Sequence, residues 1–291
     1  MKRTSAAWIA ALIVTAVSAY FQRVTGPTYP LSGSARLGGS DVGFTLPRSH
    51  SSASEAHVSI AIPDTLVQAE LRWRRSGTND TWMVDTMARE GEMLAGALPA
   101  QPPAGKVEYR VALRLGADTT LLPAAAPAVI RFKGDVPAGI LATHIALMFA
   151  GMLFSTRAGL TVMTREERTG FLTTATLILL GAGGLLLGPV VQKYAFGAYW
   201  TGWPFGSDLT DNKTVAAMAA WTAAALMRRR VRQPRLWAAA AALITLAVFM
   251  IPHSLFGSEL DYRQPRSPAV SVSPLRPAGH DERAPDGGGH P

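Results

Sequence analysis

Long apolar stretches separated by polar segments predict several membrane-spanning helices in this chain. About 20 apolar residues, and in some proteins as few as 17, cross the hydrocarbon core of a bilayer as a helix. The first stretch lies near the start of the sequence, and the other four lie after residue 136. The stretches are 6–21, 137–155, 171–191, 214–227 and 236–252.

Clusters of basic residues between these stretches predict how the chain is oriented. Lys and Arg are concentrated in short cytoplasmic loops of membrane proteins. If the chain crosses at every stretch, all three clusters fall on the same, cytoplasmic side. The clusters are Lys2 and Arg3, then Arg157, Arg165 and Arg168, then Arg228, Arg229, Arg230, Arg232 and Arg235. The segment after the first stretch is therefore expected outside the cytoplasm.

The first stretch, within residues 1–21, fits both a signal peptide and a membrane anchor. Its short apolar core and the sequence at 17–19 are typical of a cleavable signal. Its apolar residues span about 24 Å as a helix, less than a bilayer core of about 30 Å. Tyr20 and Phe21, however, suit the interfacial belt of an uncleaved anchor. Both interpretations place residue 22 outside the cytoplasm.

Residues 22–136 alternate polar and apolar side chains with the period of β-strands. Alternating runs at 57–62, 66–74, 105–115 and 128–132 are separated by turn signals at 38–41, 77–80, 101–105 and 116–118. Seven or eight short strands at this spacing predict an all-β immunoglobulin-like or fibronectin-like sandwich. The expected core aromatics are Trp73, Trp82, Tyr109 and Phe132.

The predicted architecture has four parts. Residues 1–21 form a signal or anchor, 22–136 an extracytoplasmic β-sandwich, 137–262 a four-helix transmembrane bundle and 263–291 a disordered tail. The spans of the bundle are expected at about 137–155, 171–191, 210–227 and 236–252. Asp208 is expected to cap the third of these helices, and Gly184 and Gly188 form a small-residue face for close helix packing.

Composition excludes several classes of function. The mean hydropathy of +0.16 is low for an all-membrane protein, which supports a separate soluble domain. The net charge of +8 lies mostly in the loops beside the apolar stretches, and no basic face has interleaved aromatics, so no nucleic-acid partner is expected. The absence of cysteine excludes disulfides, iron–sulfur clusters and thiolate sites.

Two histidines in the outer half of predicted spans suggest a cofactor or metal site. His144 lies about 10 Å inside the second stretch, and His253 ends the fifth. Paired imidazoles can hold haem b, and imidazole with thioether favours copper, so His144, Met148, Met152, Met250 and His253 are candidate ligands. Packing of methionines and a hydrogen bond from an interior histidine are the alternatives. No cofactor is favoured.

An aromatic loop at 192–213 and nearby charges suggest a polar pocket for a small ligand or a quinone head group. The candidate ligand-binding residues are Trp200, Trp203, Asp208, Asp211, Lys213, Glu259 and Asp261. An ordinary interfacial belt with helix caps is the alternative interpretation. No nucleophile elbow, phosphate loop, dinucleotide fingerprint or HExxH motif occurs, so no catalytic residue is identified and an enzyme is not favoured.

Several segments together resemble an uncharacterised family of bacterial integral membrane proteins. They are 20–30, 101–106, 153–160, 188–193, 200–206 with 208–214, and 251–254. The resemblance covers nearly everything but the tail and implies one continuous architecture of sandwich plus helices. It brings no activity and no site residue. The alanine-rich and arginine-rich composition differs from the lysine-rich members of that family.

These observations favour a non-catalytic protein of the bacterial inner membrane, with the β-domain and the tail outside the cytoplasm. It is expected to bind a ligand or an envelope protein partner on its outer face, in contact with the lipid bilayer. The alternative is a haem- or copper-binding redox or metal-handling protein that uses His144 and His253. A secondary transporter is disfavoured because the chain shows no internal repeat.

Overall fold

The computed structural model describes residues 2–164, 169–252, 260 and 262 of the chain. The chain divides into two units, Met1–Leu260 and Asp261–Pro291. The account below concerns the first unit. His253, Glu259, Asp261 and the predicted disordered tail at 263–291 lie outside the described residues.

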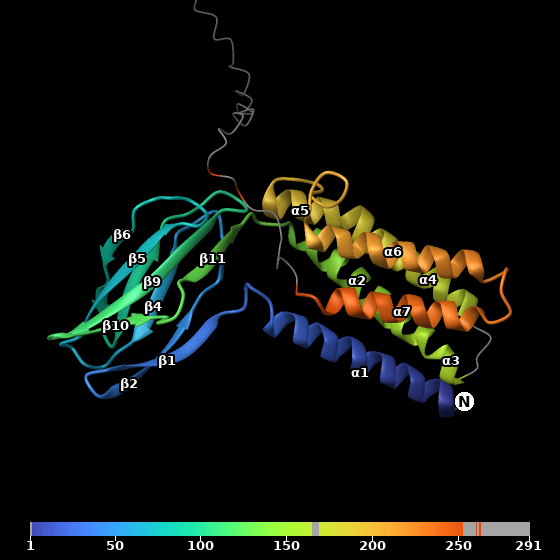
Figure 1. Cartoon of the computed structure of the whole chain (residues 1–291), viewed down its shortest axis with the longest axis horizontal. Coiled ribbons are helices and arrows are strands. Elements are labelled where there is room, and N and C mark those ends of the chain that lie inside the picture. Colours follow the sequence, from blue (N-terminus) through green and yellow to red (C-terminus); the bar gives the residue numbers. More distant parts are fainter. Residues whose placement is uncertain (1, 165–168, 253–259, 261, 263–291) are drawn as a thin grey trace, which may run out of the picture. The chain divides into compact units, whose positions relative to one another are not determined.

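Eleven strands form three sheets in the part of the chain that the structure describes, between the first and second helices (Figure 1). The largest sheet has the order β3-β11-β9-β5-β6, and β10 also pairs with β9. Its strands are β3 (Ser49–Ser51), β11 (Ala128–Lys133), β9 (Lys106–Leu115), β5 (Gln68–Arg75), β6 (Met83–Thr86) and β10 (Asp118–Leu122). All pairs are antiparallel except β11 with β3.

The two smaller sheets complete this β-rich region. One has the order β4-β8-β7, formed by β4 (Ala56–Ala61), β8 (Met93–Leu98) and β7 (Ala88–Glu90). The other is a hairpin of β1 (Leu31–Leu37) and β2 (Ser40–Leu46), joined by a two-glycine turn. Gly38 and Gly39 both have positive φ, which only glycine adopts at little cost, so this turn signal was predicted correctly.

One hydrophobic core lies beneath the two larger sheets. In β4, Val58 and Ile60 are buried while His57 and Ser59 are exposed, as the predicted alternation requires. Leu71 of β5 and Leu98 of β8 are fully buried members of the same core. The strand prediction is confirmed for all four alternating runs, whereas the short strands β3 and β7 were not anticipated.

Of the four aromatics predicted for the core, two are fully buried. Tyr109 and Phe132 have no exposed surface, and the Tyr109 hydroxyl donates a hydrogen bond of 2.6 Å to the Pro47 carbonyl. Burial raises the pKa of Tyr109, so the phenol stays a neutral donor. Trp73 packs at the edge of the core.

The prediction for Trp82 was wrong. This side chain is 38% exposed, and the Arg74 guanidinium carbon lies 4.8 Å from the centre of one of its rings. Trp82 immediately precedes the edge strand β6, whose residues are all exposed. An aromatic residue beside an edge strand fits the alternating pattern of a core position. It stays exposed because no second sheet covers it.

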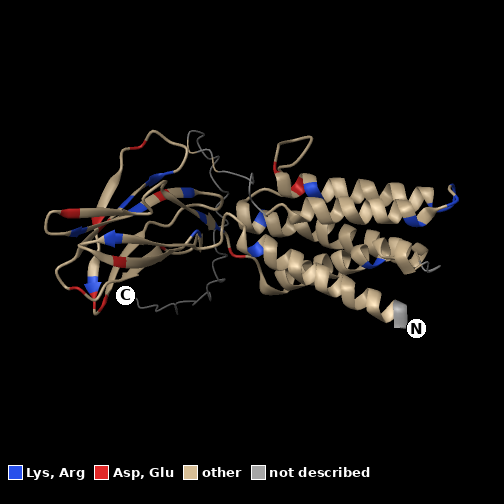
Figure 2. Ribbon diagram, turned by 60° about the horizontal axis from the view of Figure 1, so that its bottom comes forward, with Lys and Arg blue, Asp and Glu red and all other residues tan. Residues whose placement is uncertain are grey.

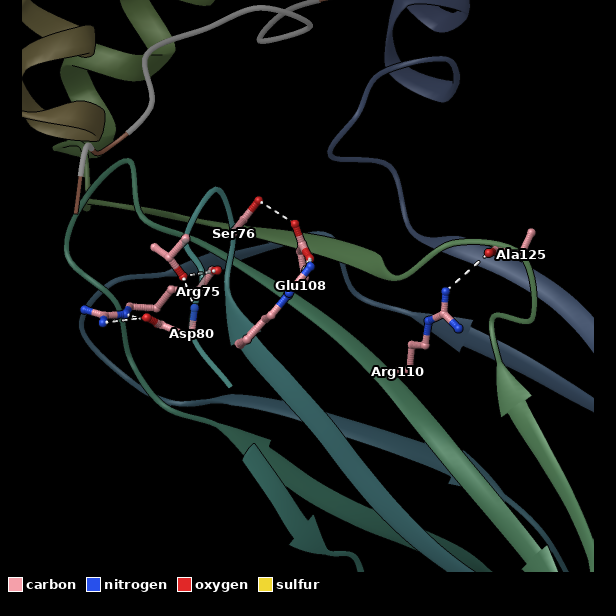
Figure 3. A network of polar contacts seen from close by, with 8 residues as sticks. Arg75, Ser76, Asp80, Glu108, Arg110 and Ala125 are labelled. Atoms are coloured by element: carbon pink, nitrogen blue, oxygen red, sulfur yellow. Dashed lines mark hydrogen bonds and ion pairs between the residues drawn. The ribbon is translucent and has the colours of Figure 1, made fainter. Parts of the chain in front are cut away.

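Charged side chains on β5 and β9 pair across the sheet (Figure 3). Glu108 accepts hydrogen bonds from Arg74 and Ser76, and Arg75 forms a two-bond contact with Asp80. The hydrogen bond from Arg75 lowers the pKa of the Asp80 carboxyl. Arg74 and Glu108 are paired on the face of the sheet opposite to buried Leu71, so their ion pair marks the outer face. Partly exposed ion pairs of this kind contribute little stability.

A helix covers each of the five apolar stretches (Figure 1). They are α1 (Lys2–Val24), α2 (Ala138–Gly159) followed by α3 (Thr161–Thr164), α4 (Thr169–Leu180) continued by the π-helix η1 (Gly181–Leu187) and α5 (Gly188–Phe196), α6 (Leu209–Met227) and α7 (Pro234–Met250). Three helical segments of the described chain are long and apolar enough to cross a membrane: Thr4–Val24, Ala138–Thr164 and Thr169–Phe196. The α7 helix is apolar but shorter.

The helices run up and down beside one another, so their connections alternate between two ends. The arginine-rich loop between α6 and α7 lies at the same end of the helices as the start of α1 (Figure 2). The end of α2, with Arg157, and the start of α4 belong to this end as well. The structure is therefore compatible with a membrane protein whose basic loops share one side.

Close contacts of α6 with α7 and with η1 hold the helices together. Trp221 of α6 is fully buried, and its Nε1 donates to Thr245 Oγ1 of α7 at 2.8 Å. A Cβ atom on Gly184 would lie 2.7 Å from Thr214 Cγ2 of α6. The predicted close packing at Gly184 is confirmed. A Cβ atom on Gly188 would have only ordinary contacts, the nearest at 3.7 Å to the Gly183 carbonyl oxygen.

The contact at Gly184 leads to a prediction. The Gly184→Ala substitution is expected to lower the free energy of unfolding by about 1–3 kcal/mol, because the added methyl group overpacks the contact with α6. Thermal unfolding of the detergent-purified protein measures this effect. Gly139→Ala in α2, where a Cβ meets no atom within 4 Å, is the control and should be neutral or slightly stabilising. Equal stability of the two variants would contradict the close packing.

Candidate functional site

A cavity of about 340 Å³ lies among α1, α2 and α7, toward the ends of these helices opposite the arginine-rich loop. The three helices contact one another pairwise. Residues from α1 and the segment after it form one wall, and residues from α2 and α7 form the other. The lining residues are Thr15, Ser18, Ala19, Gln22, Arg23, Gly26, Thr28, His144, Ile145, Met148, Met152, Phe149 and Phe249.

A second cavity of about 140 Å³ lies on the other side of His144, Met148 and Phe249, which line both cavities. Its remaining walls come from η1, α5 and the start of α6. They include the polar residues Gln192, Asp208, Thr210, Asp211, Lys213 and Thr214. The two cavities therefore meet at these three side chains, of which His144 is the polar one.

The π-helix positions this histidine. In η1 the Gly188 N–H donates to the Gly183 carbonyl, a wider turn than that of an α-helix. The same carbonyl lies 2.9 Å from His144 Nδ1. A carbonyl only accepts hydrogen bonds, so Nδ1 must bear the proton, and in the neutral ring Nε2 is then an acceptor. Because Nδ1 is occupied, Nε2 is the polar atom that His144 can offer to the cavities.

Asp211 organises the loop before α6. Its Oδ2 accepts hydrogen bonds from the Thr201 and Gly202 backbone N–H groups, at 2.7 and 2.9 Å, and from Gln192 Nε2 at 3.2 Å. The Asp208 side chain accepts from the Thr210 N–H and caps α6, which confirms the predicted cap. These bonds hold the loop onto the helix end that lines the second cavity.

Two side chains complete the C-terminal end of α7 at the same level. Gln22 of α1 donates through Nε2 to the Phe249 carbonyl at 2.6 Å and to the Ile251 carbonyl at 3.3 Å. Lys213 of α6 donates through Nζ to the Ile251 and Pro252 carbonyls at 2.7 and 3.3 Å. Carbonyls at the end of a helix lack partners within the helix, so these bonds tie α1 and α6 to α7.

The structure brings together some of the predicted site residues. His144, Met148 and Met152 line the larger cavity, and Asp208, Asp211 and Lys213 line the smaller one. Met250 lines neither cavity. The predicted residues His253, Glu259 and Asp261 lie outside the described part of the chain.

The aromatic loop does not line either cavity with its tryptophans. Trp200 Nε1 donates to the Trp203 carbonyl, and the Trp203 N–H donates to Asn212 Oδ1. The Trp203 side chain is 70% exposed and that of Phe205 is 84% exposed. The loop thus presents aromatic rings outward, which is typical of residues at a membrane surface.

Sequence reasoning missed the wall formed by α1. Thr15, Ser18 and Gln22 follow one another at helical spacing of three and four, which places them on one face. This polar stripe in an apolar helix was the available signal. It was passed over because a signal peptide and an anchor both require only apolarity in this segment.

Among the described residues, no group of three or more His, Cys, Asp or Glu side chains is placed to hold a metal ion. No protein-family model and no curated protein sequence matches this chain. The structure itself shows a β-rich region joined to helices, three of which could span a membrane.

The role of Asp211 leads to a second prediction. In Asp211→Asn the bonds from two backbone N–H groups lose their charged acceptor and become neutral bonds, which costs about 2 kcal/mol of local stability. Chymotrypsin should then cleave the loop at its exposed aromatics many times faster than in the wild type. Asn212→Ala, which removes a single neutral bond to the same loop, should have a smaller effect. Equal cleavage rates for wild type and Asp211→Asn would contradict this role.

Proposed function

We propose that this chain is a non-catalytic integral membrane protein of the cell envelope that binds an apolar ligand with a small polar group. The ligand would occupy the cavity among α1, α2 and α7, in the half of the membrane near the outer surface. The observation that supports this most strongly is the composition of the cavity wall. Most of its surface is apolar and comes from methionine, phenylalanine, isoleucine and alanine, while six of its thirteen lining residues have polar side chains.

The size of the cavity suits a small organic molecule. Its volume of about 340 Å³ is within the range of ligand pockets, roughly 300–1,000 Å³. The buried hydroxyl of Thr15 favours a bound ligand over a cavity left by imperfect packing. Its side chain is 4% exposed, and its Oγ1 is buried without a hydrogen-bond partner. A buried hydroxyl without a partner is costly, so a bound molecule that pairs with it would be favoured.

The topology supports the placement of this site. With the basic loops in the cytoplasm, the ends of the helices that hold Gln22, His144 and Lys213 lie toward the outside. In this proposal α2, α4 with η1 and α5, α6 and α7 form a four-helix transmembrane bundle, and α1 is its fifth, anchoring helix. The membrane would be the bacterial inner membrane, in keeping with the family that the sequence resembles.

The β-rich region would then be extracytoplasmic. Its two larger sheets share one core, which supports an immunoglobulin-like sandwich. A sandwich of this kind would present its exposed sheet edges to an envelope protein partner. The exposed rings of Trp203 and Phe205 would rest at the outer membrane surface.

Filling the cavity tests the proposal. Ala19 lines the cavity, whereas Ala16 is exposed on another face of α1. Ala19→Phe should displace any bound molecule, and Ala16→Phe should leave it in place. Mass spectrometry of organic extracts of the purified proteins measures the bound molecules. An apolar molecule present in wild type and Ala16→Phe but severalfold reduced in Ala19→Phe is expected. Extracts that do not differ among the three proteins would contradict the proposal.

A redox or metal protein is the second candidate, and one observation favours it. His144, Met148 and Met152 line the same cavity, and His144 Nε2 is the nitrogen left for a ligand. Imidazole with thioether sulfur is a soft set that suits copper. Haem b would need a second axial ligand, for which His253 remains the sequence-based candidate.

Absorption spectra and metal analysis separate the two candidates. Protein purified from haem-replete and copper-replete cells is expected to be colourless and free of stoichiometric copper if the cavity binds an apolar ligand. A Soret band, or one copper per chain, that is lost in a His144→Ala, His253→Ala double variant would favour the second candidate. Met250→Leu, which changes a residue outside both cavities, is the matched control.

A further inference from the structure

Resting on the proposed function, we infer that the ligand of the larger cavity presents a hydrogen-bond donor, namely a hydroxyl group on an apolar body such as an alkylphenol or a hydroquinone. The inference comes from the hydrogen-bonding capacity that the cavity wall has left once its internal bonds are made. Polar groups in a pocket of this kind fix the orientation and the chemical class of the ligand.

His144 can offer only an acceptor when its ring is neutral. Its Nδ1 donates to the Gly183 carbonyl at 2.9 Å, which leaves the lone pair of Nε2. A ligand carbonyl or ether oxygen placed against Nε2 would set two acceptors against each other. A ligand hydroxyl would instead donate to it.

Two side chains on α1 likewise have acceptor groups left for a ligand. Gln22 Nε2 has two N–H bonds, and these are used on the Phe249 and Ile251 carbonyls, so the amide oxygen remains as an acceptor. The Ser18 hydroxyl donates to the Val14 carbonyl at 2.7 Å, which leaves only its lone pairs. Three of the polar side chains that line the cavity therefore have acceptors to offer.

The donors in the wall are the Thr15 and Thr28 hydroxyls, which can also accept, and the guanidinium of Arg23. The Thr15 hydroxyl has no hydrogen-bond partner in the protein and can act as a donor or as an acceptor. Arg23 is exposed, and its guanidinium carbon lies 5.5 Å from the centre of the Tyr29 ring. A hydroxyl can donate to one of these acceptors and can also accept from Thr15, whereas an ether or a carbonyl cannot donate to any of them.

Decylphenol and nonylanisole form a matched pair of probes, because they are isomers that differ in whether the oxygen has a hydrogen. Their binding is measured with the full-length protein in nanodiscs, and binding to empty nanodiscs is subtracted. Decylphenol should bind about tenfold more tightly than nonylanisole, since the ether leaves the Nε2 acceptor of His144 without a donor. His144→Phe should abolish this preference, and Met152→Leu, a change elsewhere in the same cavity, should keep it.

His144→Gln is the conservative variant, since its amide can donate to Gly183 and still offer an oxygen. It should retain most of the preference for decylphenol. A measurement without any substitution keeps the test valid if His144→Phe fails to fold. The ¹⁵N resonance of His144 Nε2 in the wild type should shift when decylphenol is added and stay unchanged with nonylanisole.

The outcomes distinguish this inference from the proposed function. If nonylanisole binds as tightly as decylphenol, or if folded His144→Phe keeps the preference, the ligand class is wrong while the ligand site stands. Equal shifts of the His144 resonance with both probes would overturn the inference in the same way. If neither probe binds above the level of empty nanodiscs, the proposed function fails together with the inference.

Discussion

The packing of α1 against α2 and α7 is the constraint on which the site depends. Thr15, Ser18 and Gln22 form a polar stripe on a helix that is otherwise apolar, and this stripe faces the other helices. The amide of Gln22 ties the stripe to the end of α7 through two carbonyls that have no partner within their own helix. Because α1 supplies a whole wall, the larger cavity exists only in a chain that keeps this helix.

The π-helix η1 orients His144, which lies on the wall of the cavity opposite α1. Its wider turn places the Gly183 carbonyl within hydrogen-bonding distance of His144, while its glycines allow α2 and α6 to approach. The same histidine, with Met148 and Phe249, separates the larger cavity from the smaller one at the start of α6. A short irregular segment thus fixes both the orientation of an imidazole and the division of the space around it.

The sequence was informative where structure follows from local pattern. Alternation predicted the strands around Val58 and Val111, apolar runs predicted the helices, and Asp208 was correctly placed as a cap. It was not informative where a neighbour decides the outcome. Trp82 is exposed because no second sheet covers it, and the partner of His144 is a carbonyl of an irregular helix distant in sequence. The polar stripe on α1 can be found in the sequence, but whether it lines a cavity depends on which helices pack against it.

The most direct measurement is the intact mass of the mature protein isolated from membranes. The cavity requires that residues 15–23 stay attached to the rest of the chain, although the sequence at 17–19 is similar to a signal-peptide cleavage site. The account predicts a mass that includes the whole of α1. A mature chain that begins at or near residue 20 would lack Thr15, Ser18 and Ala19, and would contradict the proposed site.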